Sequence, residues 1–137
     1  MMRASTTPCV LVVDDDSTFA DTLVSLLRGE GLTANAVYSG TEAIEWALRS
    51  PPDFVLMDII MGGIDGVDAA IAICETAPAP GILLMSGHPG VDELLAKGSI
   101  RGHIFELLVK PIQFAVLLQR LRSRVGNPGH CGTHRAA

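Results

Sequence analysis

Three aspartates, one serine and one lysine stand where short apolar runs of this sequence end, and they are the side chains best suited to chemistry. They are Asp14, Asp15, Asp58, Ser86 and Lys110. Carboxylates that share a pocket repel one another and favour a cation among them, and an all-oxygen set suits a hard divalent ion such as Mg²⁺. A lysine can pair with a phosphoryl group, and a serine hydroxyl can hydrogen-bond one of its oxygens. The set therefore suits phosphoryl transfer, in which a carboxylate such as Asp58 can itself be the acceptor.

These side chains can lie close together only if the strands that precede them end at the same edge of a sheet. Strand-length apolar runs alternate five times with helical patterns, which predicts strands over residues 9–13, 32–37, 54–58, 82–85 and 104–109. The predicted helices cover about 17–28, 40–50, 67–76, 91–97 and 112–125, and Asp16, Ser39 and Asp65 offer caps for the first three. Such alternation predicts a parallel sheet with helices on both faces, and right-handed crossovers place every strand's carboxyl end on one rim.

The bulk composition fits one folded domain. The chain has 137 residues, 48% of them hydrophobic, and a net charge of −5 with scattered basic residues, which argues against a nucleic-acid-binding surface. No apolar run approaches the ~20 residues of a membrane span, and the first residues lack an apolar leader region. Three cysteines, far apart and odd in number, are typical of a reduced cytoplasmic protein and not of a disulfide framework. We expect one domain over 9–125, with disordered flanks at 1–8 and 126–137.

Four segments, in this order and spacing, resemble the receiver domain of two-component response regulators, of the kind seen in chemotaxis regulators. They are Leu11-Val12-Val13-Asp14-Asp15-Asp16, Leu56-Met57-Asp58-Ile59-Ile60-Met61-Gly62-Gly63-Ile64-Asp65-Gly66, Leu84-Met85-Ser86-Gly87 and Val109-Lys110-Pro111. The resemblance covers Cys9 to about Val125. It implies a flavodoxin-like three-layer α/β fold, (βα)5, with a five-stranded parallel sheet in the order 2-1-3-4-5.

The resemblance implies a role for each acid of the site. Asp58 would accept a phosphoryl group from the phosphohistidine of a histidine kinase or a histidine phosphotransfer protein. Asp15 and Asp58 would bind Mg²⁺ directly, with the backbone carbonyl of Ile60 as third protein ligand and Asp14 acting through a water molecule. The protein would be a phosphorylation-controlled switch and not a turnover enzyme, limited to self-phosphorylation and slow self-dephosphorylation.

Other implied roles concern the phosphoryl group and the output. Ser86 would follow the phosphoryl group, Lys110 would pair with it, and a cis peptide would join Lys110 to Pro111. The face built by the fourth helix, the fifth strand and the fifth helix would bind a downstream protein or a second copy, without direct contact to nucleic acid or membrane. Its members here would be Ile100, Arg101, Ile104 and Phe105.

The sequence departs from the family pattern at positions that affect switching. Gly62 stands where proline is usual, and Leu107 stands where receivers commonly carry an aromatic residue that rotates on activation. Phe105 lies two residues from Leu107, and strand alternation places both on one face. Ile60 and His88 occupy positions that tune dephosphorylation, and an apolar Ile60 should not help water attack an acyl phosphate. We therefore predict a phosphoryl lifetime of minutes or more.

The sequence raises two alternative functions, of which the first is set aside and the second stays open. The spacing of Asp14, Asp16 and Thr18 after a strand resembles the nucleophile motif of haloacid-dehalogenase-type phosphatases. That family needs an acidic pair downstream of its lysine, whereas this chain has no acid after Glu106, and Asp58 would have no role. The second alternative is a receiver-like interaction module that works without phosphate, which the changes at Gly62 and Leu107 keep open.

Overall fold

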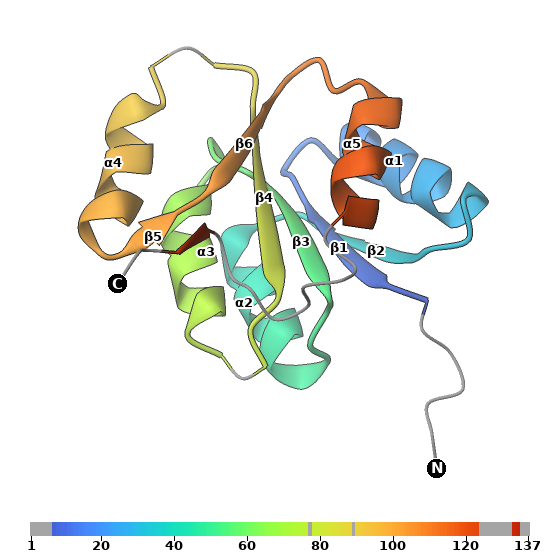
Figure 1. The fold of residues 1–137 in the computed structure, drawn as a ribbon, viewed down its shortest axis with the longest axis horizontal. Coiled ribbons are helices and arrows are strands. Elements are labelled where there is room, and N and C mark those ends of the chain that lie inside the picture. The colour runs from blue at the N-terminus through green and yellow to red at the C-terminus, as the bar shows by residue number, and fades with distance from the viewer. Residues whose placement is uncertain (1–6, 77, 89, 124–132, 135–137) are drawn as a thin grey trace.

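The structure, a computed structural model, describes residues 7–76, 78–88, 90–123 and 133–134. Strands and helices alternate along the chain as predicted (Figure 1). The strands are β1 (Cys9–Val13), β2 (Thr33–Val37), β3 (Phe54–Asp58), β4 (Gly81–Ser86), β5 (His103–Ile104), β6 (Glu106–Val109) and β7 (Thr133–His134). The helices are α1 (Ser17–Gly29), α2 (Gly40–Arg49), α3 (Gly66–Cys74), α4 (Asp92–Ile100) and α5 (Phe114–Ser123).

The main sheet has five parallel strands in the order β2-β1-β3-β4-β6. This is the predicted flavodoxin-like order, with β6 in the place of the fifth strand. Helices α1 and α5 cover one face of the sheet, and α2, α3 and α4 cover the other (Figure 1). Because the strands run parallel, β1, β3, β4 and β6 end at the same edge, which is the predicted rim.

Burial on both faces anchors the central strands. Every residue of β3 is buried. Its side chains alternate, so that Val55 and Met57 pack with α2 and α3, whereas Phe54 and Leu56 pack with α1 and α5. Each fully buried aliphatic side chain contributes about 1.5–3 kcal/mol relative to exposure. The strand that ends in Asp58 is therefore held by hydrophobic clusters on both faces of the sheet.

Side-chain caps set where three helices begin, as the sequence predicted. Asp16, Ser39 and Asp65 each accept a hydrogen bond from the backbone N–H three residues further on. Such a cap satisfies an N–H that the helix cannot and contributes about 1 kcal/mol. Lys97 of α4 pairs with Asp65 Oδ2 at 2.8 Å and so ties α4 to the start of α3.

The last part of the sheet differs from the prediction. The strand expected over 104–109 is interrupted at Phe105, so His103–Ile104 forms β5 and pairs antiparallel with β7, while Glu106–Val109 joins the main sheet. Helix α4 extends past the expected end at Lys97. Helix α5 begins two residues late because the carbonyl of Gln113 accepts its first hydrogen bonds. The Lys110–Pro111 peptide is cis, as expected.

Two expectations about the flanks and the cysteines remain. Most of the flank at 126–137 lies outside the described residues, and β7 falls within that stretch. The expectation of wholly reduced cysteines is wrong for Cys74, which is disulfide-bonded, whereas Cys9 is free. Count and spacing along a chain do not show which sulfurs the fold brings together. In the part of the chain that the structure describes, every helix is too short or too polar to traverse a lipid bilayer.

Candidate functional site

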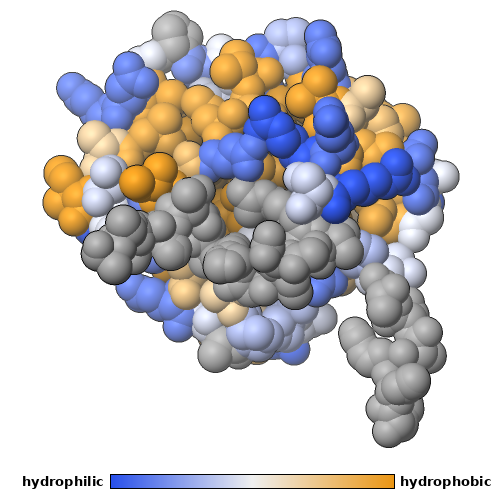
Figure 2. All heavy atoms as spheres, viewed as in Figure 1, coloured by the Kyte–Doolittle hydropathy of each residue, from blue (hydrophilic) through white to orange (hydrophobic). Residues whose placement is uncertain are grey.

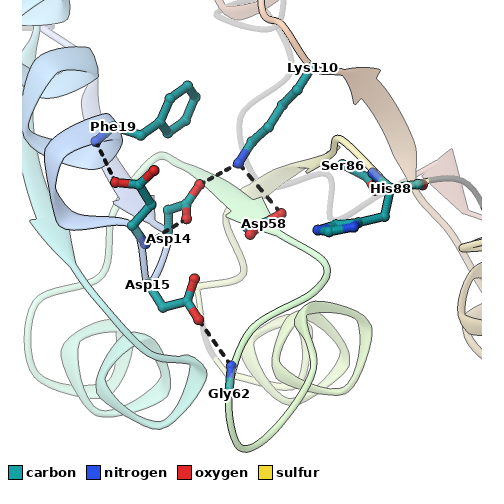
Figure 3. Close-up of polar contacts among 9 residues, drawn as sticks. Asp14, Asp15, Phe19, Asp58, Gly62, Ser86, His88 and Lys110 are labelled. Atoms are coloured by element: carbon teal, nitrogen blue, oxygen red, sulfur yellow. Dashed lines mark hydrogen bonds and ion pairs between the residues drawn. The ribbon is translucent and has the colours of Figure 1, made fainter.

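The five predicted side chains come from four neighbouring strand ends. Asp14 and Asp15 directly follow β1, Asp58 is the last residue of β3, Ser86 is the last residue of β4, and Lys110 directly follows β6. Figure 3 shows all five gathered at the carboxyl edge of the sheet. The parallel topology therefore brings together residues that lie far apart in the sequence, as the alternation of strands and helices predicted.

The acids form a compact cluster with one cation. Carboxylate oxygens of Asp14, Asp15 and Asp58 lie within 4.8 Å of one another. Asp14 and Asp58 are 1% and 4% exposed, whereas Asp15 is exposed. Lys110 Nζ lies 2.7 Å from Asp14 Oδ2 and 3.8 Å from Asp58 Oδ1. Among the described residues, Lys110 is the ammonium that pairs with this cluster, and it contacts two of the three carboxylates. The cluster therefore keeps an excess of negative charge that a divalent cation would balance.

Asp58 is the least satisfied group of this cluster. Its Oδ1 is buried and has no hydrogen-bond partner among the described residues, since 3.8 Å to Lys110 is too long for a hydrogen bond. The pKa of Asp58 is raised from 3.8 to about 6, chiefly by burial and then by the charge of Asp14, while Lys110 acts in the opposite direction. A buried oxygen with no partner, aimed between acids and an ammonium, fits a metal ion or a phosphoryl group.

Asp15 has a partner that the sequence did not reveal. Its Oδ2 accepts a hydrogen bond from the backbone N–H of Gly62 at 3.1 Å (Figure 3). A proline at position 62, usual in the resembling family, has no N–H and could not donate it. The departure at Gly62 was visible in the sequence, but its contact was not. The role of the Ile60 carbonyl as a metal ligand stays a prediction, and the Ile60 side chain is 38% exposed beside the site.

Ser86 is buried and engaged with its own loop. Its hydroxyl donates to the carbonyl oxygen of His88 at 3.2 Å and accepts from the His88 N–H at 3.1 Å. The imidazole of His88 points toward Asp58 (Figure 3), and its charge lowers the pKa of Asp58, the smallest of the influences on that group. To donate a hydrogen bond to a phosphoryl oxygen, the Ser86 hydroxyl must first release the carbonyl oxygen of His88.

Leu107 and Phe105 lie on the same side of the sheet, as predicted. Both pack with the cluster formed by α2, α3 and α4, where Phe105 is buried and Leu107 half-buried. The expectation that Phe105 belongs to the exposed output face is therefore wrong. Phe105 lies between β5 and β6, and its ring stacks on His103 with centroids 5.7 Å apart.

The other apolar members of that face are exposed. Ile100 is 85% exposed and Ile104 is 54% exposed. Figure 2 shows apolar side chains interleaved with hydrophilic ones over α4, β6 and α5. A groove of about 330 Å³ runs beside β6 and α5, with Val109 and Val116 in its lining.

Phe19 is the site residue that sequence reasoning missed. Lys110 Nζ lies 4.4 Å from the centre of the Phe19 ring (Figure 3). Phe19 lies within the predicted helix 17–28, but no pattern within one helix could show which distant side chain it meets.

The fold and the site together define an α/β protein with an acidic cluster at the carboxyl ends of its parallel strands. The family described as response regulator receiver domain matches residues 10–122. This protein therefore belongs to the response regulator receiver domain family of two-component signalling. The match makes the phosphatase alternative unnecessary, because that alternative left Asp58, at the centre of the site, without a role.

Curated relatives support the same assignment. The DNA-binding response regulator MtrA of Mycobacterium tuberculosis is 30% identical over 116 residues, which cover 85% of this chain and 50% of the relative. The transcriptional regulatory protein PrrA of Mycobacterium tuberculosis is 33% identical over 131 residues, which cover 93% of this chain and 54% of the relative. The chain thus spans about half the length of the curated relatives that it matches.

Solved structures share the fold. A CheY-like response regulator receiver domain protein from Methanospirillum hungatei superimposes with a TM-score of 0.78 at 18% identity, covering 88% of this chain and 94% of that chain. A two-component response regulator from Clostridium difficile gives a TM-score of 0.77 at 20% identity, covering 88% of this chain and 98% of that chain. The predicted chemotaxis-regulator-like architecture is confirmed.

Proposed function

We propose that this receiver takes a phosphoryl group from a phosphohistidine onto Asp58. In the transfer, the P–N bond to the donor imidazole breaks as a P–O bond to an Asp58 carboxylate oxygen forms, and the imidazole leaves as the neutral ring after taking up a proton. One observation carries the proposal, namely the buried Asp58 Oδ1, which has no hydrogen-bond partner within the described part of the chain and faces Lys110. The raised pKa of Asp58, at about 6, still leaves this carboxylate ionised at neutral pH for attack on phosphorus.

The donor set fits Mg²⁺. Asp15 and Asp58 would hold it directly, with the Ile60 backbone carbonyl, and Asp14 would act through a water molecule. When bound, Mg²⁺ supplies positive charge to the phosphoryl oxygens and offsets the repulsion among the acids. The clustering of the three carboxylates within 4.8 Å supports this assignment.

The protein's own cations and donors would then hold the product. Lys110, already facing both buried acids, would pair with the phosphoryl group once Asp58 carries it. Ser86 would leave the His88 backbone and donate its hydroxyl to a phosphoryl oxygen. Ile60 is apolar and Ser86 is engaged with its own loop, so neither would activate a water molecule for attack on the acyl phosphate. We therefore expect an acyl-phosphate lifetime of minutes or more. A lifetime of seconds would contradict this expectation.

The proposed partners follow from the family. The upstream partner would be a histidine kinase or a histidine phosphotransfer protein in the cytoplasm. The downstream partner, or a second copy, would bind the face of α4, β5, β6 and α5 through Ile100, Arg101 and Ile104. The domain itself would contact neither nucleic acid nor membrane. Because a relative is named as a DNA-binding regulator, the absence of nucleic-acid contact needs a direct binding experiment. Receiver domains are generally not true enzymes, and we propose only self-phosphorylation and slow self-dephosphorylation here.

Intact-mass measurement after incubation with acetyl phosphate and Mg²⁺ tests the proposal. We expect one phosphate adduct in the wild type and in the exposed-acid control Asp92→Asn. The adduct should be lost in Asp58→Asn and in excess chelator. An adduct that survives Asp58→Asn would overturn the choice of acceptor.

A second candidate function is a phosphate-independent interaction module. The observation that favours it is Leu107, a half-buried aliphatic side chain where an aromatic switch residue is usual. Absence of any adduct with acetyl phosphate and with a phosphorylated histidine phosphotransfer protein, together with absence of Mg²⁺ binding, would support this alternative.

A further inference from the structure

The lysine of the site lies over an aromatic ring that comes from a different part of the fold. Lys110 follows β6, whereas Phe19 lies in the first turn of α1. Lys110 Nζ is 4.4 Å from the ring centre, within the distance at which an ammonium is attracted to the negative face of a phenyl ring. Figure 3 shows the ring beside the lysine, across from the carboxylates of Asp14 and Asp58.

Phe19 is itself held in place. Its backbone N–H donates to Asp16 Oδ1 at 3.2 Å, which is the capping bond that starts α1. Its half-buried ring packs against the hydrophobic cluster beneath α1 and α5. The ring is therefore a fixed surface, and its place does not depend on the lysine.

Lys110, in contrast, has a long and flexible side chain. An isolated lysine ammonium keeps many rotamers and prefers water. Here it has neighbours on two sides, with Asp14 and Asp58 on one and the Phe19 ring on the other. Its side chain is only 23% exposed. The ring thus closes the side through which the ammonium would otherwise turn away from Asp58.

We propose that Phe19 is a positioning residue that confines the Lys110 ammonium to the place where it meets the phosphoryl group on Asp58. This inference rests on the proposed function of Asp58. It assigns to α1 a part in the chemistry beyond supporting the sheet. The ring acts through its face, so an aromatic residue at position 19 should preserve the effect and an aliphatic residue of similar bulk should not.

The chain offers a matched control and an internal reference. Phe114 is also half-buried against the same cluster and, among the described residues, no contact of its ring with Lys110 is observed, so Phe114→Leu reproduces the loss of a phenyl ring elsewhere. The chain has two lysines, Lys97 and Lys110. Lysine labelled with ¹³C at Cε therefore gives two Cε signals, and Lys97, which pairs with Asp65, serves as the reference.

The experiment compares wild type, Phe19→Leu, Phe19→Tyr and Phe114→Leu. In wild type, the ring should shift the Cε protons of Lys110 upfield of those of Lys97. Phe19→Leu should remove this shift and slow adduct formation from acetyl phosphate and Mg²⁺ by about 3- to 10-fold, the range expected for one partly buried cation–π contact. Phe19→Tyr should restore both the shift and the rate, and Phe114→Leu should leave both unchanged.

Two results would overturn the proposal. One is a wild-type spectrum in which Lys110 shows no upfield shift. The other is a Phe19→Leu rate no slower than that of Phe114→Leu. If the wild type forms no adduct with acetyl phosphate or with a phosphorylated histidine phosphotransfer protein, the proposed function fails. The presence or loss of the Lys110 shift still decides whether Phe19 confines the ammonium.

Discussion

Asp58 must be ionised to accept a phosphoryl group, although its surroundings in the fold disfavour the ionised form. It is buried, and it faces two further acids, yet phosphoryl acceptance needs it charged. Both burial and Asp14 raise its pKa, and Lys110 compensates only in part. Keeping Asp58 ionised therefore lowers the stability of the folded protein. A bound cation, or a covalent phosphoryl group paired with Lys110, would remove this destabilisation.

Because ionised Asp58 destabilises the fold, we predict that Asp58→Asn is more stable than wild type at high pH. The pKa of Asp58 is about 6 in the folded state against 3.8 ordinarily, so between these values the folded state binds more protons than the unfolded state. Stability therefore falls as pH rises through this window, by up to about 3 kcal/mol. Urea unfolding in chelator should show Asp58→Asn more stable than wild type at pH 8, by roughly 1–3 kcal/mol, and similar to it at pH 4. Equal stabilities at pH 8 would contradict the prediction.

Gly62 should tune metal affinity through Asp15. Its N–H donates a hydrogen bond to Asp15 and so orients that carboxylate. Loss of a hydrogen bond that orients a metal ligand typically weakens metal binding by about 10-fold or more. The backbone at Gly62 is not in the positive-φ region, and a Cβ there would meet nothing within 4 Å. Gly62→Pro should therefore fold and bind Mg²⁺ about 10-fold more weakly by calorimetry, whereas Gly62→Ala, which keeps the N–H, should bind like wild type. Equal affinities in the two variants would exclude this role.

At the scale of elements, the start of α3 packs directly on the backbone of the acceptor. The N–H of Gly66 donates to the carbonyl of Ile59 at 2.8 Å. A Cβ on Gly66 would collide with the carbonyl oxygen of Asp58 and lie 2.7 Å from Ile59 Cα. The capping turn at Asp65 thus depends on a glycine that allows helix and strand end to touch.

Gly66→Ala should consequently be strongly destabilising. The backbone beneath Asp58 must move to admit the methyl group, and we expect a loss of about 2 kcal/mol or more in the free energy of unfolding. Gly29→Ala, at the end of α1 where a Cβ meets nothing within 4 Å, is the control and should be neutral or slightly stabilising. Urea unfolding at pH 7 measures both. A Gly66→Ala variant as stable as the control would show that the loop adapts without cost.

At the scale of the whole molecule, metal binding should raise thermal stability. The folded state gathers three carboxylates that the unfolded chain separates, so Mg²⁺ binds the folded state preferentially. At 100 times its Kd, Mg²⁺ should add about 2.7 kcal/mol, seen as a higher Tm, and Asp15→Asn should remove most of this gain. Because the chain carries a net charge of −5, NaCl at matched ionic strength is the necessary control. A gain of equal size with NaCl would point to general screening.

Local patterns in the sequence determined most of the fold. Apolar runs, capping residues and their alternation predicted the strands, the helices and the rim at which Asp14, Asp58 and Lys110 meet. These features depend on residues close together in the chain, and parallel topology then follows from the handedness of the crossovers. The family resemblance rested on the same short segments.

Only the tertiary structure decided the contacts that give the site its properties. It placed the Phe19 ring against Lys110, the Gly62 N–H on Asp15 and the Ser86 hydroxyl on His88, and it left Asp58 Oδ1 without a hydrogen-bond partner among the described residues. It also turned Phe105 inward and divided the predicted last strand. The physical reason is that a hydrogen bond or a ring contact depends on fractions of an ångström between separate segments, which packing sets and local periodicity does not encode.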